Sequence, residues 1–347
     1  MIRKYLYGTP FPTNAVVTDI PPSTEQLPFF ETDSKGTFTY PLQNEDVVYG
    51  LGEQIRGINK RGWQYVSWNS DNPNHQEDTR SLYGAHNFIL ISGRQTFGAF
   101  FDNPGRMEFD IGYTHGNRMQ IRAEKNDLTV YIITGQDEKH IVKQFRQLIG
   151  RSYIPPLWAF GYGQSRWGYQ NEQDVRQVAQ QYQAAGIPLD SIYLDIDYME
   201  RYKDFTVDPE RFPDLGKLVQ DMRTQGIRLV PIIDAGVKIE TGYDVYQEGV
   251  AHNYFCKNAE GKDFVGAVWP GRVHFPDFLQ PEARNWFGKK YAVLTDLGIE
   301  GFWNDMNEPA IFYTEDRLAE TCSEIQRLTA GNMGIDEYFA FTGMVAG

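Results

Sequence analysis

The segment from Gly301 to Pro309 reads Gly-Phe-Trp-Asn-Asp-Met-Asn-Glu-Pro and brings an indole and two carboxyl groups together. It continues an apolar run that predicts a β-strand, and side chains at positions i and i+2 of a strand lie on the same face. Trp303 and Asp305 should therefore point the same way. A carboxylate beside an indole suits a developing oxocarbenium ion that is bounded by an aromatic wall. The alternative, that Asp305 and Glu308 only cap the next helix, stays open at this point.

A second acidic segment reads Leu-Asp-Ile-Asp-Tyr-Met from Leu194 to Met199, so that Asp195 and Asp197 are expected to share a strand face. Two neighbouring carboxyl groups can divide acid and base roles between them, bind hydroxyl groups or hold a metal ion. The metal interpretation is the weaker one, because the six histidines show no ligand spacing such as HExxH. We therefore expect neither a metal nor another cofactor.

The elements that position these residues follow a repeating pattern after residue 155. An amphipathic helix ends at a glycine, an isoleucine follows, and an apolar strand then runs into an acidic residue. With an opening strand at 158–163, this order predicts parallel strands with right-handed connections. Barrel enzymes carry their active sites at the carboxyl ends of such strands. The three acidic residues at these strand ends are Asp195, Asp234 and Asp305.

An open doubly wound sheet is the competing architecture, but the turn Gly161-Tyr-Gly163 lacks the spacing of a dinucleotide fingerprint. The long separation between Asp234 and Asp305 predicts an insertion near 240–276. A closed barrel needs eight strands, and the pattern supplies four. We therefore expect the chain to be a truncated piece rather than half a barrel with open edges.

The first part of the chain has a different pattern, in which short apolar or alternating segments are separated by Gly, Asn and Asp. This pattern predicts an antiparallel β-sandwich over residues 1–137. Residues 138–154 then form a connecting helix and linker, and residues 155–347 form the barrel part. The predicted sandwich strands lie at 47–49, 88–91, 97–101, 107–111, 119–123 and 128–133.

The composition of the chain limits the classes of partner that it is expected to bind. The chain has 33 basic and 46 acidic residues and a net charge of −13, which disfavours nucleic acid. No apolar run reaches the ~18 residues that a membrane helix needs, so we expect no membrane partner. Two cysteines argue against a disulfide framework, and the start of the chain shows no export signal, so we expect a cytoplasmic protein. The aromatic content of 14% fits either large cores or stacking on sugar rings.

Four segments together resemble the signatures of glycoside hydrolase family 31, the α-glucosidase family. They are the two acidic segments already described, Val268-Trp-Pro-Gly271 and Phe275-Pro-Asp-Phe278. The resemblance implies a β-sandwich followed by a (β/α)8 TIM barrel, of which about the first four βα units are present. It also implies a retaining exo-α-glucosidase that acts on small isomaltose- or maltose-type oligosaccharides through a β-glucosyl intermediate.

The resemblance also implies roles for single residues. Asp305 would be the nucleophile with Glu308 in support, and the acid/base would lie beyond residue 347. Trp167, where the family has Tyr or Trp, resembles the isomaltase side of the family. The residues expected to contact substrate are Asp71, Trp167, Asp195, Ile196, Asp197, Asp234, Trp269, Trp303 and Met306.

Related activities stay open. An α-transglucosylase would use the same intermediate with a sugar as acceptor, and a non-catalytic sugar-binding relative would keep the pocket alone. Family members that act on α-xylosides replace the tryptophan-rich motif, so the motif around Trp303 favours glucose over xylose. The sequence leaves the oligomeric state undetermined.

Overall fold

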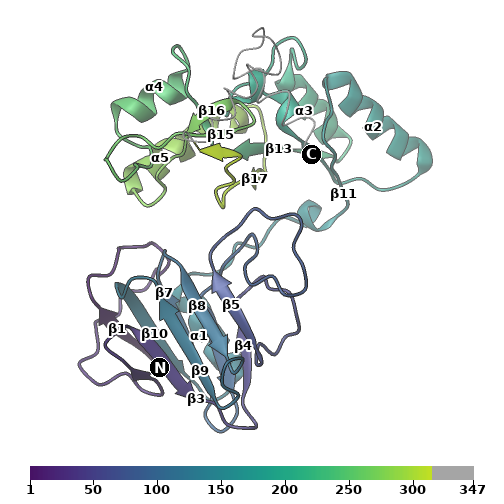
Figure 1. The fold of residues 1–347 in the computed structure, drawn as a ribbon. Helices are drawn as coiled ribbons and strands as arrows, with labels where there is room; N and C mark the ends of the chain where they lie inside the picture. The colour runs from purple at the N-terminus through teal and green to yellow at the C-terminus, as the bar shows by residue number, and fades with distance from the viewer. Residues whose placement is uncertain (315–347) are drawn as a thin grey trace. The chain divides into compact units, whose positions relative to one another are not determined.

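The computed structural model describes residues 1–314. It divides the chain into two compact units, one formed by residues 1–153 and one that starts at Ile154 (Figure 1). In the described part, no helix is long and apolar enough to cross a membrane. Each unit has a hydrophobic core of its own.

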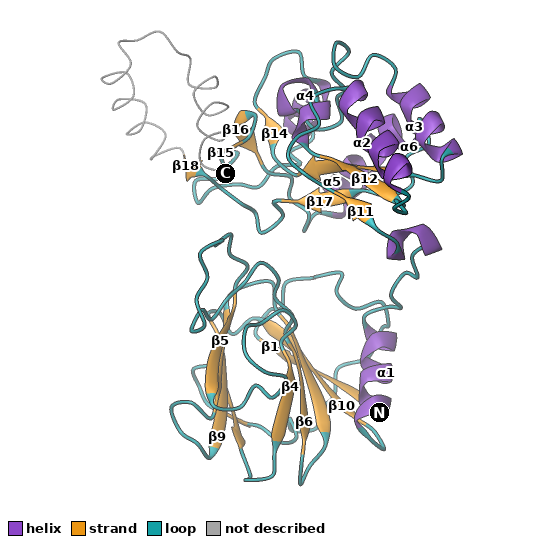
Figure 2. Cartoon of the chain, turned by 90° about the vertical axis from the view of Figure 1, so that its right-hand side faces the viewer, coloured by secondary structure: helices purple, strands orange, loops and turns teal. Residues whose placement is uncertain are grey.

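The first unit is the predicted antiparallel β-sandwich, with two sheets of five strands each (Figure 2). One sheet has the order β1-β10-β7-β6-β4 and the other the order β2-β3-β9-β8-β5. The strands are β1 Ile2–Tyr7, β2 Glu31–Thr32, β3 Thr37–Pro41, β4 Val47–Gly50, β5 Trp63–Ser67, β6 Phe88–Ser92, β7 Phe97–Asp102, β8 Met107–Ile111, β9 Arg118–Ala123 and β10 Leu128–Thr134.

Alternation along the strands builds the core between the two sheets. In β8, Met107, Phe109 and Ile111 are buried while the acidic residues between them face outward. Phe38 and Phe101 meet edge to face with ring centroids 5.4 Å apart, and Phe101 meets Phe109 in the same way at 6.1 Å. Much of the aromatic content of the first unit therefore serves core packing.

Helix α1 (Glu138–Leu148) lies in the first unit, in the region expected from the sequence to form a connecting helix and linker. Its N-cap is Asp137, whose side chain accepts a hydrogen bond from the backbone N–H of His140 at 2.7 Å. Ile141 is buried, and the Phe145 ring stacks on Phe88 of β6 with centroids 3.9 Å apart. The helix therefore covers the outer face of one sandwich sheet.

The second unit contains the predicted parallel sheet, in the order β11-β12-β13-β17. Strand β13 reads Arg-Leu-Val-Pro-Ile-Ile-Asp and is buried along nearly its whole length, as expected for a parallel strand covered on both faces. Its strands and helices are β11 Gly163–Gln164, α2 Glu172–Ala185, β12 Ser191–Leu194, α3 Leu215–Thr224, β13 Arg228–Asp234, α5 Pro281–Lys290, α6 Ala292–Thr295 and β17 Trp303–Asp305.

The prediction of an opening strand at 158–163 is wrong for most of that range. Leu157–Phe160 forms the short 3-10 helix η1, and only Gly163–Gln164 pairs with β12. The helix stops are as expected: α2 ends at Gly186, which has a φ of 67° in the left-handed region that glycine adopts without strain.

The segment between β13 and α5 forms structure of its own beside the parallel sheet. A helix, α4 (Asp244–Ala251), and a small antiparallel sheet of order β14-β16-β15-β18 occupy it, with β18 returning from beyond β17. The strands are β14 Val237–Lys238, β15 Gly266–Val268, β16 Gly271–His274 and β18 Tyr313–Thr314. The short 3-10 helices η2 Ile196–Tyr198 and η3 Glu200–Tyr202 follow β12.

Candidate active site

Three aspartates meet at the carboxyl ends of adjacent parallel strands. Asp234 is the last residue of β13 and is the register partner of Asp305, the last residue of β17. On the other side of β13, the last residue of β12 is paired with Pro231, and Asp195 comes directly after it. The charges of Asp305 and Asp195 both act on the carboxyl group of Asp234, and that of Asp305 acts on Asp195, so we treat the three carboxyl groups as one cluster.

Asp305 is half-buried, and its Oδ1 accepts a hydrogen bond from the N–H of Met306 at 2.8 Å. Along β17, Asn304 is exposed while Trp303 and Asp305 are half-buried, so the indole and the carboxyl group share a face of the strand. The Trp303 ring meets Tyr193 of β12 edge to face at 6.2 Å. Aromatic rings therefore lie next to the carboxyl cluster.

Asp234 is the most deeply buried member of the cluster, with 5% of its surface exposed. Burial raises the pKa of Asp234 to about 8, and the negative charges of Asp305 and Asp195 contribute to the rise. Asp234 is therefore uncharged near neutral pH. The cluster then keeps fewer negative charges than its three carboxyl groups would suggest.

Asp195 and Asp197 do not share a strand face, which corrects the expectation from their spacing. Strand β12 ends at Leu194, and the side chain of Asp195 caps η2 by accepting a hydrogen bond from the N–H of Ile196 at 2.7 Å. Burial raises the pKa of Asp195, and the charges of Asp197 and Asp305 raise it further. Asp195 is thus part of the cluster, whereas the carboxyl group of Asp197 is engaged by Gln170 and Arg211.

Asp197 holds the loop that carries Trp167. The residue is 2% exposed, and its carboxyl group accepts a hydrogen bond from Gln170 Nε2 at 3.0 Å and lies 3.7 Å from Arg211 Nη1. Burial raises its pKa, while Arg211, Gln170 and the Trp167 side chain, which also donates to it, lower the pKa. A Cβ at Gly168 would lie 1.9 Å from Asp197 Oδ2, so this close approach requires glycine.

Trp167, Trp269 and Phe312 form an aromatic group in the second unit. The ring centroids of Trp167 and Trp269 are 5.6 Å apart, and those of Trp269 and Phe312 are 5.0 Å apart. Trp167 is 37% exposed, which leaves part of its surface available to a ligand. The structure therefore brings together two tryptophans that are about 100 residues apart in the sequence.

The remaining predicted residues of the second unit are mainly in packed positions. Ile196 is buried in the core of the unit, and Met306 packs against the cluster formed by Val268, Val273 and Phe275. Glu308 is half-buried in the turn after β17. Their expected roles at the substrate stay predictions.

Asp71 lies in the first unit, in the exposed loop between β5 and β6. The aspartate cluster belongs to the second unit, so the expected contact of Asp71 with substrate stays a prediction.

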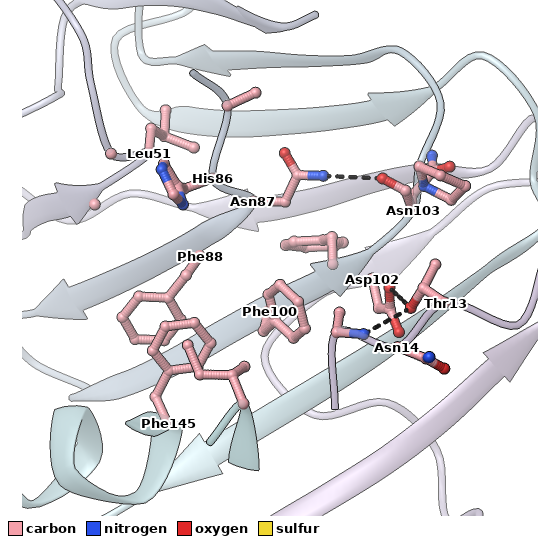
Figure 3. Close-up of a pocket in the computed structure, with 17 residues that line it drawn as sticks. Thr13, Asn14, Leu51, His86, Asn87, Phe88, Phe100, Asp102, Asn103 and Phe145 are labelled. Atoms are coloured by element: carbon pink, nitrogen blue, oxygen red, sulfur yellow. Dashed lines mark hydrogen bonds between the residues drawn. The ribbon is translucent and has the colours of Figure 1, made fainter. Parts of the chain in front are cut away.

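A cavity of about 710 Å³ lies in the first unit, between the N-terminal segment, β7 and α1 (Figure 3). It contains none of the predicted site residues, and its single carboxyl group, Asp102, accepts a hydrogen bond from Thr13 at 2.6 Å. Chemistry that needs paired carboxyl groups therefore belongs to the aspartate cluster.

Four residues that contact the predicted site residues were not evident from the sequence. Gln170 and Arg211 contact Asp197, Tyr193 contacts Trp303, and Asp204 contacts Asp234. Each becomes part of the site only through contacts with distant segments, so a strand-end pattern does not reveal them. Among residues 1–314, no group of three His, Cys, Asp or Glu side chains is arranged to hold a metal ion.

Comparison with known proteins connects this geometry to a family. The model for the glycosyl hydrolases family 31 TIM-barrel domain matches residues 152–335, and the glycosyl hydrolase 31 N-terminal galactose mutarotase-like domain matches residues 17–110. An alpha-glucosidase 2 from Bacillus thermoamyloliquefaciens is 44% identical over 273 residues, which cover 78% of this chain and 35% of the relative. An alpha-glucosidase from Saccharolobus solfataricus is 27% identical and covers 93% of this chain and 48% of its own.

Solved structures agree with these matches. A Flavobacterium johnsoniae GH31 dextranase in complex with isomaltotriose superposes with a TM-score of 0.75 at 30% identity, covering 83% of this chain and 36% of that one. The glucosidase II alpha subunit gives a TM-score of 0.71 at 26% identity, covering 80% of this chain and 32% of that one. The chain thus spans between about a third and a half of the length of these relatives.

Proposed function

The chain belongs to glycoside hydrolase family 31, and from this premise we propose that the protein removes terminal α-linked glucose from short oligosaccharides with retention of configuration. The observation that carries the proposal is the register pairing of Asp234 with Asp305, with Asp195 at the adjacent strand end. Family membership supports the proposed substrate class, because the similar proteins include α-glucosidases and a dextranase.

Asp305 is the proposed nucleophile. Its carboxylate attacks the anomeric carbon of the terminal glucose while an acid protonates the leaving oxygen, and a β-glucosyl ester forms. A water molecule, deprotonated by the same group now acting as base, then hydrolyses the ester and restores the Asp305 carboxylate. Two inversions at the anomeric carbon give an α-glucose product.

The cluster divides the remaining tasks. Asp234 carries a proton near neutral pH, but with 5% exposure it cannot reach a leaving oxygen, so we do not assign it as the acid. We expect the acid to come from outside the described residues. Asp195 is half-buried, and we assign it to accept hydrogen bonds from glucose hydroxyl groups. Trp167 and Trp269 offer aromatic surface to the sugar rings.

The linkage preference is proposed from Trp167. An indole at this position narrows the space next to the terminal glucose, and the flexible α-1,6 linkage tolerates a narrow space better than α-1,4. The similarity to a dextranase in complex with isomaltotriose supports this preference. We therefore propose isomaltose-type over maltose-type substrates.

The test is kinetic and stereochemical. The full-length protein and its Asp305→Ala variant are assayed on p-nitrophenyl α-glucoside, maltose and isomaltose, with Asp19→Ala, an exposed aspartate of the first unit, as control. We expect the Asp305 variant to lose at least about 10³-fold in kcat and the control to keep its activity. Proton NMR should show α-glucose as the first product. Wild-type turnover in the Asp305 variant, or β-glucose as first product, would contradict the proposal.

A further inference from the structure

Asp204 lies directly behind the aspartate cluster and is 1% exposed. Its Oδ1 accepts a hydrogen bond from the backbone N–H of Asp234 at 3.1 Å. Its backbone carbonyl accepts a hydrogen bond from the Tyr243 hydroxyl at 2.6 Å. Asp204 therefore ties the turn after η3 to the end of β13 and to the segment that begins α4.

The surroundings of the Asp204 carboxyl group favour its uncharged form. The titratable groups that face it are Asp234 and the hydroxyl groups of Tyr198, Tyr243 and Tyr291. None of these is a cation. The neighbouring Lys203 directs its ammonium group to Glu200 at 3.3 Å and to Glu240 at 3.1 Å instead.

Two carboxyl oxygens in this pair lack partners. Asp204 Oδ2 and Asp234 Oδ1 are both buried, and neither has a hydrogen-bond partner among the described residues. A buried carboxylate is costly when a donor reaches fewer than both of its oxygens, and this cost favours the uncharged form. Burial raises the pKa of Asp204 well above its usual range, and Asp234 raises it further once Asp234 itself has lost its proton.

We propose that Asp204 is a positioning residue for the glycosidase reaction: as an uncharged acid it fixes the carboxyl end of β13 and so holds Asp234 beside Asp305. The inference rests on the proposed function. Asp305 must be anionic to attack, and an ionised carboxyl behind Asp234 would add negative charge to a cluster that already contains Asp195 and Asp305. An uncharged Asp204 still accepts the hydrogen bond from the Asp234 N–H, and it does so without adding negative charge to the cluster.

A role limited to packing predicts different results from a positioning role. Asp204→Asn keeps an oxygen for the Asp234 N–H and is uncharged, whereas Asp204→Ala removes the oxygen. The matched control is Asp46→Ala in the first unit. Asp46 is likewise buried, at 2% exposure, and accepts hydrogen bonds from Tyr40 at 3.2 Å and from the Gln43 N–H at 2.9 Å. All three variants are made in the full-length protein.

The assay measures kcat and KM on p-nitrophenyl α-glucoside from pH 5 to pH 9, corrected for the folded fraction. We expect Asp204→Ala to lose about 30-fold or more in kcat with little change in KM, and Asp204→Asn to restore kcat to within about threefold of wild type. The alkaline limb of the asparagine variant should coincide with that of wild type. Asp46→Ala should lower stability and leave kcat unchanged.

Three results would overturn the inference. They are a wild-type kcat in folded Asp204→Ala, an equal loss of kcat in the alanine and asparagine variants, and an alkaline limb of Asp204→Asn that is shifted by about one pH unit from that of wild type. If Asp204→Ala does not fold, the inference is tested by the kcat of Asp204→Asn and by the alkaline limb of its pH profile. If wild type shows no turnover, the proposed function fails. Urea unfolding still tests whether Asp204 is protonated in the folded protein. In that case the urea midpoint of Asp204→Asn should rise relative to that of wild type between pH 5 and pH 8. A constant difference would show that Asp204 is charged.

Discussion

Replacing Asp234 with asparagine should stabilise the second unit increasingly as the pH rises. Burial raises the pKa of Asp234 from 3.8 to about 8. Between these values the unfolded chain has lost the proton while the folded protein keeps it, so wild-type stability falls as the pH increases. Each pH unit is worth about 1.4 kcal/mol, and the free energy of unfolding of the variant should gain about 4 kcal/mol on wild type between pH 5 and pH 8.

The measurement is urea unfolding at several pH values, followed by tryptophan fluorescence. Five of the seven tryptophans lie in the second unit, so the signal reports mainly on the unit that contains Asp234. Asp71→Asn removes an exposed carboxyl group from the first unit and serves as the control for loss of a charge. A difference between Asp234→Asn and wild type that is constant with pH, or that shrinks as pH rises, would refute the reasoning.

Three further substitutions probe the site and the core. Gly168→Ala should lower kcat/KM at least about tenfold, because its Cβ would collide with Asp197. The control Gly57→Ala, whose Cβ would meet nothing within 4 Å, should keep the wild-type kcat/KM. Steady-state kinetics of both variants tests this prediction. Trp167→Tyr should raise the ratio of maltose to isomaltose turnover, and an unchanged ratio would remove the linkage argument. Phe38→Ala, at 0% exposure in the sandwich core, should cost about 3 to 5 kcal/mol in urea unfolding, and a loss below about 1 kcal/mol would contradict the assigned packing.

The sequence was most informative where a local pattern and the tertiary environment agree. Strands of the first unit such as β6 and β8 follow from their apolar or alternating residues, and α2 and α3 follow from their apolar faces and terminal glycines. Strands β3 and β5 were not predicted, because short segments with mixed polarity become strands only when distant partners pair with them.

The errors near the site have local causes. The expected strand at 158–163 shrinks to β11 because only Gly163 and Gln164 find register partners on β12. Asp197 is not on the expected strand face because the strand has already ended: Asp195 is the N-cap of the 3-10 helix η2, and Asp197 lies within that helix. Asp204 gave no signal at all, since an aspartate in a loop is usually exposed and its burial depends on β13.

Asp305 is proposed to form a covalent bond to the sugar, and the whole mechanism depends on this bond. The most direct test incubates the full-length protein with a fluorinated α-glucosyl fluoride that slows hydrolysis of the ester, and then identifies the labelled peptide by mass spectrometry. We predict one fluoroglucosyl group on the side chain of Asp305. A label on Asp195 or Asp234, or inactivation without any covalent adduct, would contradict the account.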